Sequence, residues 1–173
     1  MKPLTSRRST RLGTGAGLAV AAAALAACQS LVTTVPLSQQ LAPLDLALSE
    51  APDALEAQAH SGDGQAQLAM VIVSTYGLAG RRPDAAAASR WRQQARSNRR
   101  YMPITQYTAA FNGSPSRVNI INIPVQAISD AQWQAVGRCV AVLAGDGVNG
   151  QSACGDAEET RRRQTAWRRS IEQ

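Results

Sequence analysis

The spacing of apolar and polar residues predicts helices over several segments of the chain. The first spans residues 53–61 and stops at Gly62. A second follows, with Asp63 as its N-cap and Gly77 at its end, and a third begins at Asp84. Apolar residues lie at helical spacing on one side of the third helix, and the second is expected to bury apolar residues along its length, so each helix has a face to bury. The residues expected on those faces are Ala66, Leu68, Met70, Val71, Val73, Tyr76, Ala87, Ala88, Trp91 and Ala95.

Two further helices are predicted near the C-terminus. Ser129 and Gln132 form a capping box for a helix from Asp130 to about Leu143. The last helix, residues 156–172, has acids near its start and arginines later, as the helix dipole favours. Its arginine clusters are either a solvated face or a site for an anionic partner, such as lipopolysaccharide phosphate or an acidic protein. They consist of Arg161, Arg162, Arg163, Arg168 and Arg169.

Residues 101–125 differ from the helical segments. β-Branched and aromatic residues flank Asn112–Gly113, which is the strongest short signal for a β-hairpin. Pro124 would confine the second arm to the edge of a sheet. The segment is therefore expected to form a small β-hairpin, with irregular extended chain as the alternative. The fold class expected for the whole chain is mainly α.

The first 27 residues have the layout of a secretory signal. A head with Lys2, three arginines and no acid precedes a short apolar stretch rich in alanine. A transmembrane anchor is disfavoured, because about 20 strongly apolar residues are needed to span the hydrocarbon core. The stretch ends in Leu25–Cys28 (LAAC). This ending resembles the lipobox of bacterial lipoproteins, which has an aliphatic residue, two small residues and a cysteine.

The resemblance implies that Cys28 carries a diacylglyceryl group and becomes the first residue after cleavage. Its amine then takes a further acyl chain, such as palmitate, and two or three chains anchor a protein stably. Gln29, in place of an aspartate, implies an outer-membrane lipoprotein facing the periplasm rather than an inner-membrane one. A plain cleaved signal is the alternative to lipidation. Ser6–Arg8 is similar to a twin-arginine signal, a minor alternative to the general export route.

The region after the signal shows no clear period. Residues 28–51 mix Ser, Gln, Thr, Pro and Leu, so we expect a tether between lipid and domain, with a helical turn at 44–50. A helical hairpin is expected over residues 52–100. The remainder, residues 101–173, is expected to be the extended segment and the C-terminal helices, packed on that hairpin.

The charge balance of the exported chain argues against a nucleic-acid partner. The whole sequence has a formal net charge of +6 and an isoelectric point near 10.0. Removal of residues 1–27 takes away four of the 18 cations, and the arginines that remain nearly balance the 12 acids. Aromatic residues make up 4% of the chain, so the core should be small, rich in alanine and suited to close helix packing.

The segment 62–95 resembles a Sel-one-like repeat, the bacterial relative of the tetratricopeptide repeat. The family pattern opens with Gly-Asp-x-x-Ala-Gln, continues with a tyrosine and a glycine, and closes with Asp, Ala, Trp and Ala. The matching residues are Gly62, Asp63, Ala66, Gln67, Tyr76, Gly80, Asp84, Ala88, Trp91 and Ala95. Tyr76 lies two residues later than in the family, and Val71 replaces a glycine, so the repeat is degenerate.

The resemblance implies two antiparallel helices that approach through alanines, with the tyrosine and the tryptophan between them. Such repeats normally stack, because a single one cannot bury its own apolar faces. No second copy is visible in the sequence. Either flanking helices cap the repeat, or part of its apolar face stays unpaired and marks an interaction site.

The chain shows no catalytic constellation, so we expect a non-enzymatic protein without cofactor or metal ion. Its one histidine, His60, should be an exposed residue at a helix end. Residues 145–150 (GDGVNG) lack the features of a phosphate or calcium loop and are interpreted as a turn. Cys139 and Cys154 have no histidines near them for a zinc site. With Cys28 used by lipid, they are expected to form a disulfide in an oxidising compartment, two free thiols being the alternative.

These features favour a lipid-anchored periplasmic adaptor or scaffold that contacts the membrane through its lipid and binds another envelope protein through the helical repeat. Tyr76 and Trp91, with Arg92 and Arg96 beside them, are the candidate binding residues. If the C-terminal helices cover this face, Trp91 is only a core residue. The alternative function is a cell-wall or glycan-associated regulatory factor, or a weak hydrolase, with an unrecognised site.

Overall fold

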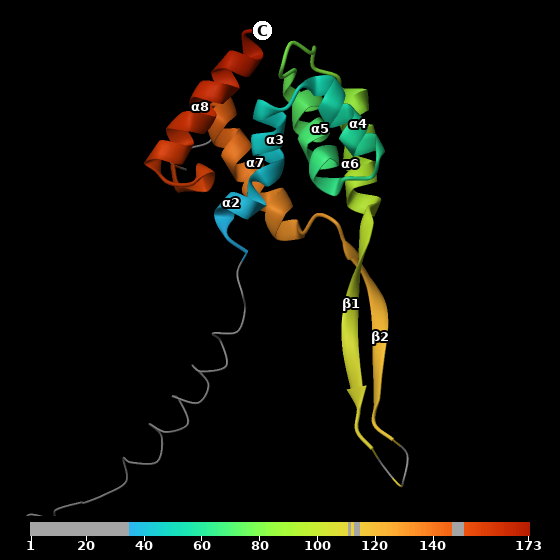
Figure 1. Ribbon diagram of the computed structural model, residues 1–173. Helices are drawn as coiled ribbons and strands as arrows, with labels where there is room; N and C mark the ends of the chain where they lie inside the picture. Colours follow the sequence, from blue (N-terminus) through green and yellow to red (C-terminus); the bar gives the residue numbers. More distant parts are fainter. Residues whose placement is uncertain (1–34, 111, 113–114, 147–150) are drawn as a thin grey trace, which may run out of the picture. The chain divides into compact units, whose positions relative to one another are not determined.

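The computed structural model describes residues 35–110, 112, 115–146 and 151–173 (Figure 1). The signal peptide and the lipidation site expected at Cys28 lie outside the described residues. The fold is mainly α with one small antiparallel sheet, as the sequence predicted. The elements are α2 (Leu37–Gln40), α3 (Ala42–Ser49), α4 (Pro52–His60), α5 (Gly64–Tyr76), α6 (Ala85–Ser97), β1 (Arg99–Thr108), β2 (Arg117–Gln126), α7 (Asp130–Ala144), the 3-10 turn η2 (Gln151–Cys154) and α8 (Ala157–Ile171).

Three helices begin at the capping residues that the sequence indicated. Asp63 and Asp84 each accept a hydrogen bond at 2.9 Å from a backbone N–H in the first turn of α5 and α6. Ser129 and Gln132 form the capping box at the start of α7. Gly77 ends α5 in the left-handed region, with φ at 67°. Local chemistry therefore sets these four helix boundaries.

α5 and α6 form the antiparallel helical hairpin. The side-chain amide of Asn98, just after α6, donates to the Gly62 carbonyl oxygen at 2.7 Å and to Oε1 of Gln67 at 2.9 Å, near the start of α5. At the opposite end, the Asp84 amide donates to the Ser74 carbonyl oxygen at 2.8 Å. The two helices are thus fastened at both ends.

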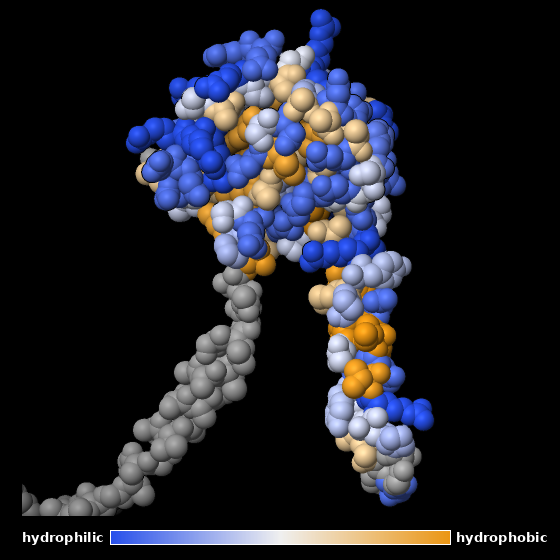
Figure 2. All heavy atoms as spheres, in the orientation of Figure 1, coloured by the Kyte–Doolittle hydropathy of each residue, from blue (hydrophilic) through white to orange (hydrophobic). Residues whose placement is uncertain are grey.

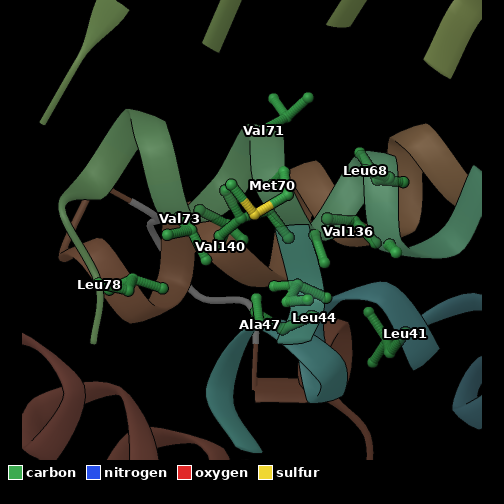
Figure 3. Packing of buried hydrophobic residues seen from close by; sticks show 14 of the residues in the cluster. Leu41, Leu44, Ala47, Leu68, Met70, Val71, Val73, Leu78, Val136 and Val140 are labelled. Carbon is green, nitrogen blue, oxygen red and sulfur yellow. The ribbon is translucent and has the colours of Figure 1, made fainter. Parts of the chain in front are cut away.

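α5 lies at the centre of the hydrophobic core. Every residue from Gly64 to Ser74 is buried except the half-buried Gln65, and α5 packs against α3, α4 and α6. Figure 3 shows Met70 of α5 among side chains of α3 and α7, with Val140 beside it. A helix that is buried on all sides offers no apolar face of its own to solvent.

The folded part of the chain begins earlier than the sequence indicated. Residues 28–51 were expected to be a tether, but α2 and α3 belong to the compact unit that starts at Pro36. Leu41, Leu44 and Ala47, spaced three residues apart, are almost completely buried. This helix was not predicted because proline usually breaks a helix. Pro43, however, lies in the first turn of α3, where proline is tolerated.

A disulfide joins α7 to the turn η2. Cys139 and Cys154 are bonded, with their Cα atoms 4.8 Å apart, and both are completely buried. The structure thus pairs the two cysteines that the even count predicted. The glycine-rich turn between them was expected over residues 145–150, of which 147–150 lie outside the described residues.

Arg163 of α8 is a buried ion pair partner rather than a surface arginine. It is 2% exposed and makes two hydrogen bonds to the Asp45 carboxylate of α3, at 2.7 and 2.8 Å. It also donates to the Cys154 carbonyl oxygen. The hydrogen bonds to Asp45 raise the pKa of Arg163, against the opposing effect of burial. Arg161 and Arg162 are exposed, so the predicted solvated cluster excludes Arg163.

Candidate interaction surface

β1 and β2 form an antiparallel ribbon between α6 and α7. Its ten residue pairs run in unbroken register from Arg99–Gln126 at the base to Thr108–Arg117 near the tip. Every residue of both strands is exposed, except the half-buried Val125. The predicted hairpin is therefore confirmed, and both of its faces are open to solvent (Figure 1). Gly113 of the expected Asn112–Gly113 turn lies outside the described residues.

The register divides the ribbon's large apolar side chains between two faces, because paired residues share a face and successive pairs alternate. The aliphatic face, with side chains 40–46% exposed, consists of Met102, Ile104, Ile121 and Ile123. The tyrosine face, with side chains 63–71% exposed, consists of Tyr101, Tyr107, Val118 and Ile120. Figure 2 shows apolar side chains gathered on the strands.

This concentration of exposed apolar surface is confined to the ribbon. Outside it, the exposed large hydrophobic residues among the described residues are Val35 and Ile171. A two-stranded hairpin is only marginally stable in water by itself. Contiguous apolar surface that a monomer fails to bury usually marks an interaction site. The ribbon is therefore the strongest candidate for an interaction surface in the described part of the chain.

The outer edges of the ribbon are less suited to binding than its faces. Pro103 lies in β1 and Pro124 in β2, yet the pairing continues in register across both. Proline has no N–H, so the missing donor of each must fall on the outer edge of its strand. A proline there interrupts the row of donors that an added strand would need. The edges are thus protected, as expected for a strand confined to an edge by Pro124.

The ribbon is basic as well as apolar. Residues 99–126 contain three arginines and no aspartate or glutamate. At the base, Arg99 donates to the Arg96 and Asn98 carbonyl oxygens at 2.8 and 3.2 Å. The guanidinium of Arg96 lies 5.1 Å from the ring centroid of Trp133 in α7. This cation–π contact holds α6 and α7 together where the ribbon leaves them.

The aromatic residues proposed as a binding face in the helical hairpin are turned inward. Trp91 is 7% exposed, and its ring lies 4.9 Å from that of His60. Tyr76 is half-buried, 5.1 Å from the ring of Trp167 in α8. Trp91 thus has the core position stated as the alternative to docking. Of the two arginines proposed with these rings, Arg96 contacts Trp133 as described above.

Arg92, the second of the two arginines proposed as binding residues, is exposed on α6 one helical turn before Arg96. The structure therefore does not gather the four candidate binding residues into one open surface. Two belong to packed aromatic pairs, and two are arginines on the solvent side of α6.

Groups that could carry chemistry are sparse in the described residues. Among these residues, no cluster of three His, Cys, Asp or Glu side chains could hold a metal ion. His60 is exposed, and its Nε2 lies 3.9 Å from a carboxylate oxygen of Glu56. A hollow of about 290 Å³ between α3 and α8 contains Asp45 and Arg163 in its lining. Their charged groups already bind each other.

The ribbon residues were missed as functional residues because the hairpin was treated only as a structural element. The signal that could have found them is apolar character on both faces of one strand. In β1, Tyr101 and Tyr107 alternate with Met102 and Ile104. Strands of that kind are normally buried on both sides. A small, alanine-rich core of helices cannot cover a ribbon of this length on both faces.

Comparison with known proteins adds no assignment. No protein-family model, curated protein or solved structure matches the chain. The Sel-one-like resemblance therefore stays a prediction. Within the described residues, no helix combines the length and apolar character that crossing a bilayer requires.

Proposed function

We propose that this protein is a lipid-anchored, non-enzymatic adaptor of the bacterial outer membrane that faces the periplasm. It binds another envelope protein, and its binding element is the β-ribbon rather than the helical hairpin. The observation that supports this proposal is the concentration of exposed large apolar side chains on β1 and β2. Tyrosine, methionine and arginine, all present on the ribbon, are enriched in the centres of protein interfaces.

The chemistry of the ribbon specifies the kind of surface that it binds. The tyrosine face offers rings that are 67–70% exposed, each with an apolar body and a hydroxyl group. Three arginines without an acid make the ribbon attractive to negative charge. The partner is therefore a protein surface with an apolar depression for the tyrosine face and acidic residues opposite the base of the ribbon, where Arg99 lies on that face.

The proposed lipid anchor brings the ribbon to partners at the membrane. With Cys28 acylated, residues 29–35 separate the lipid from the compact unit that starts at Pro36. A segment of that length spans at most about 25 Å when fully extended. A strand of ten residues is roughly 33 Å long. The helical body, which consists of α2–α8 without the ribbon, is thus kept near the bilayer. The ribbon has enough reach to contact membrane-associated proteins.

Site-specific photo-crosslinking in cells tests the docking proposal. A photoreactive residue replaces Tyr107 on the tyrosine face, and the captured protein is identified and purified. Its binding to the adaptor is then measured with Ile120→Arg and with Arg92→Glu, an exposed control on α6. We expect Ile120→Arg to weaken binding roughly tenfold or more, because it places a charge in the apolar contact. A loss of binding with Arg92→Glu alone would return the docking site to the helical hairpin.

Mass spectrometry of protein purified from membranes tests the anchor. We expect the mature chain to begin at Cys28, with a mass increase that corresponds to a diacylglyceryl group and an amide-linked acyl chain. An intact Met1, or cleavage elsewhere with an unmodified Cys28, would contradict the lipoprotein proposal without affecting the docking proposal.

A further inference from the structure

The aliphatic face of the ribbon has a defined order of rows from base to tip. The first row pairs Arg100 with Val125, and the next two contain the four aliphatic residues of the face. The fourth row pairs Gln106 with Asn119. An apolar block two rows long is therefore bounded by a cation on one side and by two amides on the other.

The two faces differ in the number of side-chain groups that can hydrogen-bond to water. The tyrosine face carries phenolic hydroxyls, and Thr105 and Asn122 lie between its apolar residues on the same face. These groups can hydrogen-bond to solvent. The central rows of the aliphatic face contain only methyl and methylene groups and one thioether. The central rows of the aliphatic face are thus the part of the ribbon whose burial needs no polar partner.

We infer that the aliphatic face binds the aliphatic face of a second copy of this chain, so that the adaptor works as a homodimer. The two ribbons pack face to face, about 10 Å apart, with their strands antiparallel. The Met102 row of one copy then lies over the Ile104 row of the other. Each hairpin gains a second layer, which is what a two-stranded sheet needs for stability.

The polar rows at the ends of the block favour this antiparallel pairing. It sets the guanidinium of Arg100 opposite Gln106 of the second copy, whose side-chain carbonyl can accept its hydrogen bonds. A parallel pairing would instead bring both Arg100 side chains to the same end, opposite Val125, with no acceptor. The antiparallel arrangement therefore gives each Arg100 an acceptor and separates the two Arg100 side chains.

A second copy fits the aliphatic face better than a lipid bilayer does. Insertion into hydrocarbon would strip water from the unpaired N–H and C=O groups along both outer edges of the ribbon. Face-to-face pairing leaves those edges in water. Four side chains that are only 40–46% exposed make a small interface, below the roughly 800 Å² per partner typical of stable complexes. We therefore expect a weak dimer in solution, strengthened when lipid anchors confine both copies to one membrane.

The inference rests on the proposed function, because it assigns the second face of the same ribbon, but its test is separate. Sedimentation of the mature chain carrying Cys28→Ser should show a monomer–dimer equilibrium in the micromolar range. Ile104→Arg on the aliphatic face should weaken dimerisation roughly a hundredfold, because it would bury an unpaired charge. The matched control, Ile120→Arg on the tyrosine face, should leave dimerisation unchanged while it disrupts partner binding.

Cysteine crosslinking tests the antiparallel register in the lipidated protein. Met102→Cys and Ile104→Cys chains, mixed in vesicles, should crosslink to each other more efficiently than either does to itself. Ile120→Cys should not crosslink.

Three outcomes would overturn the inference. They are a monomer at several hundred micromolar, equal sensitivity to both arginine variants, and a monomer that binds phosphatidylglycerol vesicles through the aliphatic face. An intact dimer whose external partner still binds the Ile120→Arg variant would instead contradict only the proposed function.

Discussion

The helical body buries its apolar residues, whereas the β-ribbon exposes them. α5 buries ten of its residues, whereas no residue of β1 or β2 is fully buried. The difference comes from the number of layers. α5 packs against α3, α4 and α6, so each of its sides meets another helix. The ribbon is a single layer, and a single layer cannot bury either face without a partner.

The comparison shows that apolar residues in this chain have two different roles. In the body they stabilise the fold, so their substitution should lower the free energy of unfolding. In the ribbon they are available to other molecules, so their substitution should change binding and leave the body stable. Substitutions in the two regions should therefore differ in stability, from a large loss in the body to almost none in the ribbon.

Loss of the buried Arg163 should cause the largest loss in the stability of the helical body. Arg163→Ala removes the bidentate contact with Asp45 and leaves the Cys154 carbonyl oxygen without its donor. We expect the free energy of unfolding to fall by about 4 kcal/mol in urea denaturation. Arg162→Ala, next to it and exposed, should change stability by less than about 0.5 kcal/mol. Equal effects of the two variants would show that the buried pair has no special role.

The pH dependence of the Arg163 contribution follows from its raised pKa. A pKa that is higher in the folded state gives stability that is lost only as the pH rises through that folded value. The loss therefore falls above the ordinary pKa of arginine. The stability difference between wild type and Arg163→Ala should not shrink between pH 7 and pH 10, measured by urea denaturation.

Removal of the disulfide should cause the next largest loss in the free energy of unfolding. The double variant Cys139→Ala with Cys154→Ala opens a loop of 15 residues and should cost about 3 kcal/mol in the chain-entropy model. Thermal unfolding with and without a reducing agent checks this expectation. Reduction should lower the melting temperature of wild type and leave that of the double variant unchanged. Full labelling of both thiols in denatured, non-reduced wild type would contradict the bridge.

Two glycines separate the cost of a backbone conformation from that of a steric clash. Gly77 and Gly80 have similar φ values, 67° and 73°. A Cβ on Gly77 would lie 2.8 Å from the Arg81 carbonyl oxygen. A Cβ on Gly80 would have its nearest neighbour, the backbone of Gln173, at 4.0 Å. Gly77→Ala should therefore cost about 2 kcal/mol and Gly80→Ala about 1 kcal/mol, by denaturant titration. Similar losses would mean that the chain relaxes around Gly77.

Truncation of the ribbon should have the smallest effect on stability. If residues 101–124 are replaced by a short turn, we expect the helical body to lose less than about 1 kcal/mol. Circular dichroism during thermal unfolding would measure it. A drop of several kilocalories per mole would show that the ribbon belongs to the cooperative unit and would remove the division between the two regions.

The parts of the fold that sequence could predict are those with local causes. Asp63, Asp84 and the Ser129–Gln132 capping box mark helix starts through contacts within one turn. The pairing of the cysteines followed from their even number. Arg163 could not be placed in this way, because its partner Asp45 lies 118 positions away, in a segment that was expected to be a tether.

The exposure of the ribbon could not be predicted for a similar reason. Its pairing follows from alternating residues around Asn112, which is local information. Whether a second layer covers a strand depends on how many other elements remain to pack against it. Among the described residues, α3, α4 and α6 pack around α5, and α7 and α8 pack against η2 and α3. The candidate site follows from what these helices leave uncovered.

The hydrogen bond at the base of the ribbon has a consequence for the order of folding. The Ala127 amide donates to the Asn98 carbonyl oxygen at 3.1 Å, at the junctions with α6 and α7. Hairpins form in about 1–10 μs from residues near in sequence. Such zipping would bring the ends of α6 and α7 together early and reduce the loop-closure entropy of their packing. A flexible Gly-Ser segment of equal length should therefore slow refolding while leaving the unfolding rate almost unchanged.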